Sequence, residues 1–183
     1  MSISTALKIL RFFLENPYKE IHLRELSRTL KISPFAIKKY ADMLLANNQI
    51  VERKQANLRM FRANNSNPAY RHLKIAENLQ NIQESGLVPY LKETVPAVTS
   101  MVLFGSVATG TDDRQSDIDL VIIGKKTKTD LSSFEKKLGK PINHHIFSWA
   151  EWKKKQKQDR AFYQDVIING IPLEGELPLV KER

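Results

Sequence analysis

The chain has 183 residues, contains no cysteine and carries a formal net charge of +9. Without cysteine it has no disulfide framework, no thiolate metal site and no cysteine nucleophile. No stretch approaches the roughly 18 to 20 apolar residues of a membrane span, and the first residues lack the pattern of a signal peptide. We therefore expect a soluble, cytoplasmic protein that does not contact the membrane, long enough for one domain or two small ones.

The positive charge is concentrated near the N-terminus. Residues 1–65 hold 12 Lys and Arg against 5 Asp and Glu, whereas residues 66–183 hold 17 against 15. Such a bias indicates a module that faces a polyanion. A solubilising surface would give the same imbalance, so charge alone leaves both interpretations open.

Three short helices followed by a β-hairpin are predicted in the first third of the chain. Apolar spacing places the helices at residues 3–16, 23–30 and 34–48, and the strands at residues 50–54 and 60–64. The third helix has a strong start signal, because Ser33 can accept a hydrogen bond as N-cap and Pro34 suits the first helical position.

This order of elements is typical of a winged helix-turn-helix, in which the third helix reads the major groove of DNA. Side chains suited to base and phosphate contacts occur on the third helix and on the hairpin. They are Phe35, Lys38, Lys39, Arg53, Lys54, Arg59 and Arg62. Together with the charge bias, the pattern favours DNA binding. Winged helices also serve as protein-docking or dimerisation modules, and that alternative remains open.

Connecting helices are expected over residues 66–94, which carry balanced charge and several apolar side chains. These side chains could pack against either domain or against a second subunit. We expect a homodimer, because winged-helix proteins that read palindromic DNA bind as pairs.

From Val95 onward strands alternate with helices, which predicts a small α/β domain over residues 95–183. Strands are expected at 98–104, 117–123 and 141–147, helices at 130–139, from Ser148 onward and at 160–169, and an extended tail at 171–175. Ser148 and Glu151 have the spacing of a capping box, and Gly139 can end the helix that Asp130 begins. The predicted organisation is a domain at 1–65, connecting helices at 66–94 and a second domain at 95–183.

The most informative stretch lies inside this second domain. A predicted strand ends at Gly105-Ser106, a polar loop follows, and Asp117 and Asp119 flank a single isoleucine. Gly105 lets the backbone approach a bulky ligand, and Ser106 supplies a hydroxyl and an N–H where a helix could begin. Residues two apart on a strand point to the same face, so the aspartates form a pair of hard oxygen ligands. The stretch predicts a phosphate cradle beside a divalent-metal site.

This stretch resembles the signature of the DNA polymerase beta-like nucleotidyltransferase superfamily, and in particular that of the minimal nucleotidyltransferases. Their pattern joins Gly-Ser to a later Asp-x-Asp, and here ten residues separate Ser106 from Asp117. Proteins that pair an N-terminal winged helix with such a domain are known, and this chain is similar to them over nearly its whole length. The resemblance implies an α+β winged helix-turn-helix, connecting helices and a small mixed-sheet nucleotidyltransferase-like domain.

The resemblance also implies an activity: transfer of a nucleotide, AMP from ATP or another NTP, to a macromolecular hydroxyl. Gly105, Ser106 and Ser116 would bind the nucleotide, and the catalytic pair Asp117 and Asp119 would hold Mg²⁺ or Mn²⁺. In the family, such proteins often act as antitoxins that adenylylate HEPN-type ribonuclease toxins. The expected partners are therefore a nucleotide, DNA and a HEPN-type toxin.

One departure from the family pattern puts turnover in doubt. Active members supply a third carboxylate from a later strand, where this chain has Asn143. An amide can coordinate a metal but cannot act as a base. His145 shares the face of Asn143 and could take a proton or touch the metal, or it could be an ordinary hydrogen-bonded histidine.

The alternative function is therefore a DNA-binding transcriptional regulator whose second domain binds nucleotide and metal but turns over weakly or not at all. An antibiotic-modifying transferase has little support, because small-molecule acceptors need a pocket domain. Asp112 and Asp113 are interpreted as solvated loop residues, although they could compensate for the missing carboxylate. A lysine cluster on the helix after Trp152 is either a solvated face or a contact with a nucleic-acid acceptor such as a tRNA end. It comprises Lys153, Lys154, Lys155 and Lys157.

Overall fold

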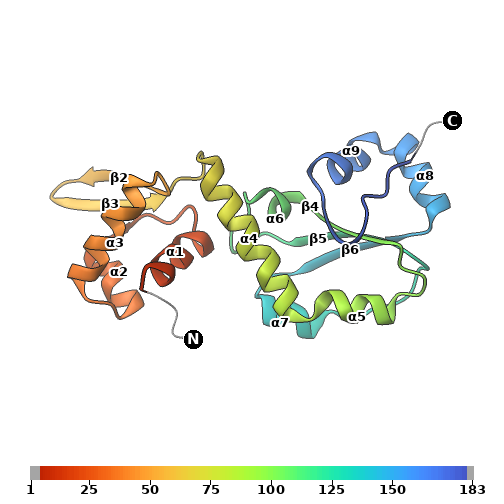
Figure 1. Ribbon diagram of the computed structural model, residues 1–183, viewed down its shortest axis with the longest axis horizontal. Coiled ribbons are helices and arrows are strands. Elements are labelled where there is room, and N and C mark those ends of the chain that lie inside the picture. The colour runs from red at the N-terminus through yellow and green to blue at the C-terminus, as the bar shows by residue number, and fades with distance from the viewer. Residues whose placement is uncertain (1–4, 181–183) are drawn as a thin grey trace. The chain divides into compact units, whose positions relative to one another are not determined.

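The computed structural model describes residues 5–180. The chain divides into two compact units, with the boundary between Lys74 and Ile75. This boundary falls inside the helix α4 (Pro68–Ser85), which lies in the segment predicted to connect the domains. Each unit has its own sheet and its own apolar core (Figure 1).

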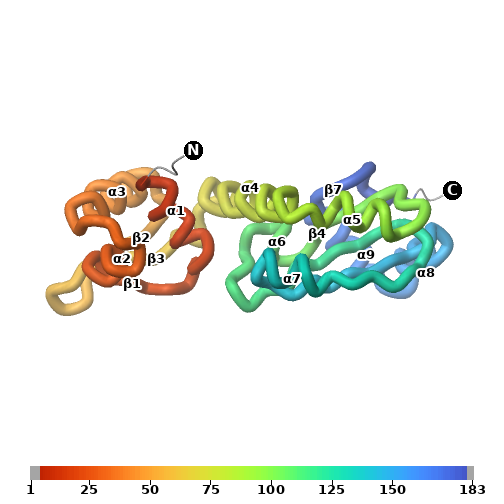
Figure 2. Tube along the Cα trace, turned by 90° about the horizontal axis from the view of Figure 1, so that it is seen from below, coloured from red at the N-terminus to blue at the C-terminus, as the bar shows by residue number. Residues whose placement is uncertain are grey.

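The N-terminal unit consists of helices and a three-stranded antiparallel sheet of order β1-β3-β2. Its elements are α1 (Thr5–Glu15), β1 (Ile21–His22), α2 (Leu23–Leu30), α3 (Pro34–Ala46), β2 (Ile50–Gln55), β3 (Leu58–Ala63) and the first part of α4. The turn of the β2–β3 hairpin projects beyond the three helices (Figures 1 and 2). Residues 3 and 4 of the first predicted helix lie outside the described residues.

Local signals in the sequence account for most of these boundaries. Helix α2 has the predicted bounds, and Ser33 caps α3 by accepting a hydrogen bond from the Ala36 N–H at 3.3 Å. The strand β1 was not predicted, because two residues are too short to show an alternating pattern. It pairs with β3 through Ile21 opposite Phe61, and both of these side chains are fully buried.

The core of this unit is formed by side chains from all three helices and the sheet. Phe13, Ile37 and Phe61 are among its fully buried members. Two polar groups of α4 close the core against α1. The Tyr70 hydroxyl donates to the Phe13 carbonyl and the Lys74 ammonium donates to the Leu14 carbonyl, each at 2.8 Å. Backbone acceptors at the end of α1 are thereby satisfied.

The C-terminal unit is built on a mixed four-stranded sheet of order β6-β5-β4-β7, in which only β5 and β6 are parallel. Its elements are α5 (Leu87–Thr94), β4 (Ser100–Phe104), α6 (Gly105–Thr109), β5 (Ile118–Ile123), α7 (Ser132–Leu138), β6 (Ile142–Phe147), α8 (Trp149–Gln158), α9 (Arg160–Asn169) and β7 (Ile171–Gly175). The tail expected at 171–175 is thus an edge strand, which tolerates Pro172 because an edge leaves one side of the strand unpaired.

Helices cover both faces of this sheet. Helices α8 and α9 lie on one side, and α5 and α7 lie on the other (Figure 1). Val102, Val121 and Ile123 face α8 and α9, whereas Leu120 and Ile122 face the apolar cluster on the side of α5 and α7. Strands buried on both faces are apolar throughout, which explains the continuous runs in the sequence.

Two of the three predicted helix caps of this unit are present in the structure. Ser148 and Glu151 form the predicted capping box at α8, and Gly139 ends α7 at a φ of 66°. Asp130 lies just outside α7, where its carboxylate accepts a hydrogen bond from the Ser132 N–H at 3.0 Å.

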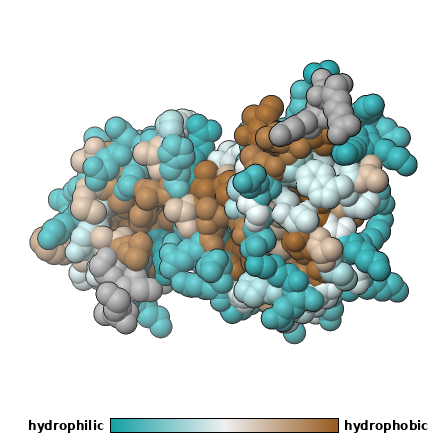
Figure 3. All heavy atoms as spheres, turned by 45° about the vertical axis from the view of Figure 1, so that its right-hand side comes forward, coloured by the Kyte–Doolittle hydropathy of each residue, from teal (hydrophilic) through white to brown (hydrophobic). Residues whose placement is uncertain are grey.

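None of the helices within residues 5–180 combines the length and the apolar character that crossing a lipid bilayer requires. Hydrophilic side chains cover much of the face seen in Figure 3, with apolar side chains in patches among them.

Candidate functional site

The sheet register brings three predicted site positions side by side. Asp119 on β5 pairs with Phe104 at the end of β4 and with Asn143 on β6. Gly105 and Ser106 follow Phe104 directly and open helix α6. The Gly-Ser turn, the aspartate and the amide therefore meet at one end of the sheet, although they come from three separate segments of the chain.

Gly105 is packed directly against the carboxylate of Asp119. A Cβ atom at position 105 would lie 2.6 Å from Asp119 Oδ2, and the glycine has a φ of +71°. A residue with a side chain could occupy position 105 only with strain, because of both the close contact and the left-handed backbone. The glycine thus lets the backbone at the start of α6 contact the Asp119 carboxylate, a group of the kind that binds metals.

The electrostatics of Asp119 are set by its partial burial. Burial raises the pKa of this carboxyl, a hydrogen bond from Asn143 opposes that rise, and the nearby charge of Asp117 adds to it. The Asn143 amide donates to Asp119 Oδ1 at 3.2 Å. Asp117 is exposed, just before β5. Two carboxylates that repel each other are a natural site for a cation.

The donors at this site are all oxygens or an amide, which suits a hard divalent cation. Residues 5–180 contain no group of three or more His, Asp or Glu side chains placed to hold a metal. The predicted pair Asp117 and Asp119 therefore has no third His, Asp or Glu ligand placed beside it within that range. Turning the Asn143 amide would replace its NH₂ group by a carbonyl oxygen, which would be an uncharged third ligand. The residues fit a divalent cation, with one carboxylate fewer than the family pattern.

His145 lies on the Asp119 face of the sheet, but it is held among aromatic rings. Its ring contacts Phe162 edge-on with centroids 5.6 Å apart and stacks near Phe147 at 6.1 Å. Burial lowers the pKa of His145, and the Asp119 charge opposes this effect. His144 is engaged elsewhere, with its Nε2 2.7 Å from the Thr129 hydroxyl. His145 is therefore the histidine of the pair that lies near the carboxylates.

The two predicted nucleotide-binding serines differ in their surroundings. Among the residues described, no hydrogen-bond partner is found for the Ser106 hydroxyl, and no side chain caps the start of α6. The Ser116 hydroxyl donates to Asp113 Oδ1 and accepts from the Asp113 N–H, both at 2.9 Å. Ser106 thus presents a free hydroxyl at the turn, whereas Ser116 holds the loop that leads to Asp117.

A buried ion pair fixes the same loop, and no pattern in the sequence predicted it. Asp112 is only 2% exposed, and its carboxylate lies 3.1 Å from Lys140 Nζ and accepts from Asn78 at 2.8 Å. Lys140 also donates to the Asp113 carbonyl. The expectation that Asp112 is solvated was wrong, because the loop folds inward onto Lys140 and α4.

Asp165 on α9 is a further acid near the site. Its charge adds to the rise in the pKa of Asp119, after burial and Asp117. Its carboxylate accepts a hydrogen bond from Asn169 at 2.8 Å. Sequence patterns did not single it out, because a lone acid on a helix matches no motif.

The residues predicted to contact DNA fall into two groups. Phe35 is 81% exposed, and Lys38, Lys39, Lys54 and Arg62 are also exposed. The other two cations are engaged with acids of the same unit. Arg53 forms an ion pair with Glu20. Arg59 reaches Glu52 at 2.7 Å and Asp42 at 2.8 Å.

The lysine cluster of α8 is mainly exposed. Lys153, Lys154 and Lys157 face solvent. Lys155 is the exception, because its ammonium lies 2.9 Å from Asp159 Oδ2 and 5.1 Å from the centre of the Phe162 ring. These contacts fit a solvated helix face.

Known proteins resemble part of this chain. The nucleotidyltransferase domain family matches residues 85–170. Protein adenylyltransferase MntA of Shewanella oneidensis is 30% identical over 97 residues, which cover 53% of this chain and 68% of that protein. A crystal structure of the toxin-antitoxin MntA-HpeT with a tyrosine-to-alanine mutation is 20% identical, covering 51% of this chain and 72% of its own, with a TM-score of 0.37. A toxin-antitoxin structure with AMP-PNP is 21% identical, with coverages of 51% and 73% and the same TM-score.

Proposed function

This chain belongs to the nucleotidyltransferase family as a homologue of the adenylyltransferase MntA, and on that premise we propose that it transfers AMP from ATP to a macromolecular hydroxyl. The observation that carries the proposal is the contact between the Gly105 backbone and the Asp119 carboxylate. A phosphate bound at the Gly105-Ser106 turn would lie beside a pair of carboxylates, which is the arrangement that metal-assisted phosphoryl chemistry needs.

Each site residue then has a distinct role. The Gly105 and Ser106 N–H groups and the Ser106 hydroxyl bind phosphate oxygens, and Asp117 and Asp119 hold Mg²⁺ or Mn²⁺. When bound, the cation neutralises the phosphates and stabilises charge on the attacking and leaving oxygens. The acceptor hydroxyl attacks the α-phosphorus in line, a new P–O bond forms, and pyrophosphate leaves as its own P–O bond breaks. The acceptor's proton passes to a base.

The acceptor that we favour is a hydroxyl of a partner toxin. Support comes from the homologue, which is named a protein adenylyltransferase. A HEPN-type toxin encoded beside this protein would be the partner, and this chain would be its antitoxin.

For the N-terminal unit we propose DNA binding through a winged helix-turn-helix. The order of three helices and a hairpin, the exposed Phe35, Lys38 and Lys39 on α3, and the local excess of positive charge support it. A homodimer would suit this role, since palindromic operators are read by symmetric pairs.

A second candidate function is that of a regulator that binds nucleotide and metal with little turnover. It is favoured by one observation, the uncharged Asn143 hydrogen-bonded to Asp119 where a third carboxylate is expected. A missing charge at a metal site can reduce rate by orders of magnitude without abolishing binding.

An adenylylation assay tests the proposal. The protein is incubated with ATP labelled on the α-phosphate, Mg²⁺ or Mn²⁺, and any toxin encoded beside it. We expect labelled toxin with the unaltered protein and none with Asp117→Asn or Asp119→Asn. Asp130→Asn is the matched control, because Asp130 accepts hydrogen bonds from Ser132 at the start of α7 and does not belong to the site. Label that persists in both site variants would refute the assignment. Absence of label with intact nucleotide binding would favour the regulator.

A further inference from the structure

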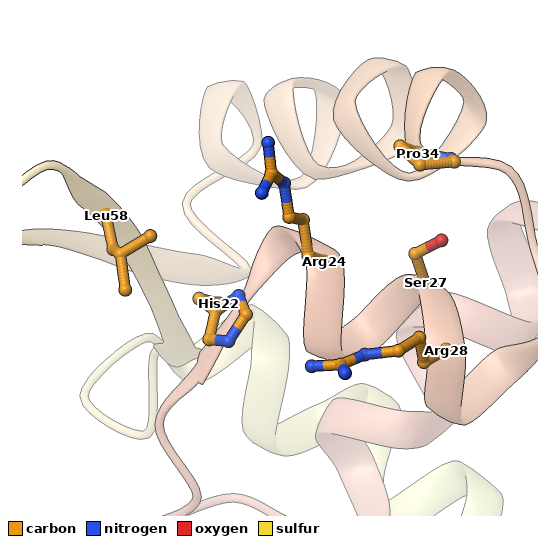
Figure 4. A pocket seen from close by; sticks show the side chains of 6 residues that line it. All are labelled: His22, Arg24, Ser27, Arg28, Pro34 and Leu58. Atoms are coloured by element: carbon orange, nitrogen blue, oxygen red, sulfur yellow. The ribbon is translucent and has the colours of Figure 1, made fainter.

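A solvent-open hollow of about 520 Å³ lies in the N-terminal unit, apart from the residues assigned to nucleotide transfer (Figure 4). It is lined by His22, Arg24, Ser27, Arg28, Pro34 and Leu58. Pro34 is the first residue of α3, and Leu58 is the first residue of β3. The hollow therefore lies between the helix proposed to enter the DNA groove and the hairpin proposed to lie beside it.

Two arginines give this hollow its charge. Arg24 and Arg28 are exposed and four residues apart on α2, so they occupy neighbouring positions on one helix face. Across residues 5–180, neither guanidinium pairs with a carboxylate. Like charges at this spacing destabilise a helix unless an anion lies between them. Their placement over a hollow thus favours an anionic ligand.

The other polar groups of the hollow are already engaged. The Ser27 hydroxyl donates to the Ile32 carbonyl at 2.6 Å, and His22 Nδ1 accepts from the Glu25 N–H at 3.3 Å. His22 Nε2 lies 3.9 Å from Glu25 Oε2. The arginines are therefore the groups that remain to bind an anion.

Two cations of the hairpin, Arg53 and Arg59, differ from Arg24 and Arg28 because each is already paired with a carboxylate. The Arg59 guanidinium donates hydrogen bonds to both Glu52 and Asp42, and these bonds raise its pKa. Its guanidinium also lies 5.2 Å from the centre of the Phe61 ring. Reaching a phosphate would require Arg59 to leave two carboxylates exposed on the surface that faces DNA. Arg59 is therefore better placed to neutralise Glu52 and Asp42 than to contact the DNA backbone.

We propose that a phosphodiester group of duplex DNA occupies the hollow, held by Arg24 and Arg28, while Arg59 screens Glu52 and Asp42 from the DNA. The inference rests on the DNA binding proposed above. A strand that runs from the groove read by α3 toward the hairpin passes between Pro34 and Leu58. These apolar side chains would lie against the sugars, and the arginines would form charge-assisted hydrogen bonds with the phosphate.

Fluorescence anisotropy with a labelled duplex from the DNA upstream of the gene tests the hollow. Arg24→Gln, Arg28→Gln and the control Lys8→Gln each remove one positive charge. We expect each hollow variant to bind about fivefold to tenfold more weakly and to lower the slope of log affinity against log salt by about 1. Lys8→Gln should change affinity less than about twofold, because Lys8 is an exposed residue of α1 that does not line the hollow.

The outcomes separate the two proposals. If the unaltered protein binds no duplex, the DNA-binding proposal itself fails. If it binds, but the hollow variants bind as well as the Lys8→Gln control, the hollow is overturned and DNA binding stands. Arg28→Lys keeps the charge and should retain the salt slope. Circular dichroism of every variant checks that the exposed substitutions leave the fold unchanged.

A second pair of variants tests the role of Arg59. Arg59→Gln should weaken duplex binding, because it leaves Asp42 and Glu52 uncompensated. Adding Asp42→Asn and Glu52→Gln to Arg59→Gln should then restore affinity to within about twofold of the unaltered protein. If the triple variant binds as weakly as Arg59→Gln alone, Arg59 contacts the DNA directly and the screening role is wrong.

Discussion

Gly105 is the residue most tightly constrained at the site. We predict that Gly105→Ala reduces ATP binding at least tenfold, because the new methyl group would lie 2.6 Å from Asp119 Oδ2. Gly139→Ala is the matched control, since Gly139 shares a left-handed φ of +66° but has no atom within 4 Å of the place where a methyl group would be added. Both variants should lose about 1 kcal/mol from backbone strain. Calorimetric titration with ATP and Mg²⁺ separates the two effects, and equal binding by both variants would contradict the steric argument.

We expect Asn143 to limit how strongly the site holds a cation. We predict that Asn143→Asp raises the affinity for Mg²⁺ and the rate of AMP transfer about tenfold, because it adds a third negative charge beside Asp119. Asn143→Ala removes the hydrogen bond without adding charge and should not increase either quantity. Titration with Mn²⁺, followed by paramagnetic resonance, measures the affinity directly. A slower Asn143→Asp enzyme with unchanged metal affinity would show that position 143 is not part of the metal site.

The raised pKa of Asp119 should make both stability and metal-dependent ATP binding depend on pH. Burial raises the pKa of its carboxyl, so the folded protein binds this proton more tightly than the unfolded chain does. This contribution stabilises the fold below the ordinary pKa of aspartate and is lost as the pH rises through the raised pKa. Metal binding needs the ionised form, so Mg²⁺-dependent ATP binding should decline on acidification at a higher pH than an ordinary aspartate would cause.

The same residue predicts opposite changes in stability and in function. Without metal at neutral pH, Asp119→Asn should melt about 1–3 °C higher than the unaltered protein while losing transfer. Asp130→Asn should not melt higher, because hydrogen bonds from Ser132 lower the pKa of Asp130 and favour its ionised form. Differential scanning calorimetry in a metal chelator measures both. A lower melting temperature for Asp119→Asn would contradict the argument from burial.

At the scale of elements, the loop between α6 and β5 depends on Lys140. Lys140→Met removes the ammonium that lies 3.1 Å from the buried Asp112 carboxylate, and we predict a loss of about 3 kcal/mol in the free energy of unfolding. Lys92→Met is the control, because the Lys92–Glu174 pair is exposed and should contribute less than about 1 kcal/mol. Urea unfolding followed by circular dichroism gives both values. Equal losses would mean that the Asp112 pair does not hold the loop.

Elements whose signals are local could be predicted from the sequence, and those that depend on distant partners could not. Helix α9 has its predicted bounds, because Asp159 and Gly170 mark its ends within the chain itself. The pairing of β7 with β4 depends on a sheet edge far away in the chain, and the sequence pattern indicated only an extended tail. A strand of two residues such as β1 is likewise too short to give a recognisable sequence pattern.

The candidate site follows the same rule. The Gly-Ser turn and the aspartate pair were predicted because they form one contiguous motif, and the register of β6 then placed Asn143 beside Asp119. The Asp112–Lys140 pair was missed, because a lysine at the start of one strand and an acid in a loop share no pattern. The acids that bind Arg59 were missed for the same reason, since Asp42 lies on another element.

At the scale of the whole molecule, the two units carry different chemistry. The excess of positive charge lies in residues 1–65, whereas the carboxylate pair and the glycine turn belong to the C-terminal unit. We predict that Asp119→Asn abolishes AMP transfer and leaves the affinity for duplex DNA within about twofold of the unaltered protein. Anisotropy titration of this variant measures the effect. A large loss of DNA affinity would mean that the nucleotide site and the DNA surface are energetically coupled.

The most direct measurement compares the pyrophosphate released with the AMP that appears on the proposed partner toxin, the latter followed by intact-mass spectrometry. We predict equal amounts of both products, dependent on ATP and a divalent cation, and neither product with Asp117→Asn or Asp119→Asn. AMP transfer that continues at an unchanged rate in the Asp119→Asn variant would contradict the proposed function.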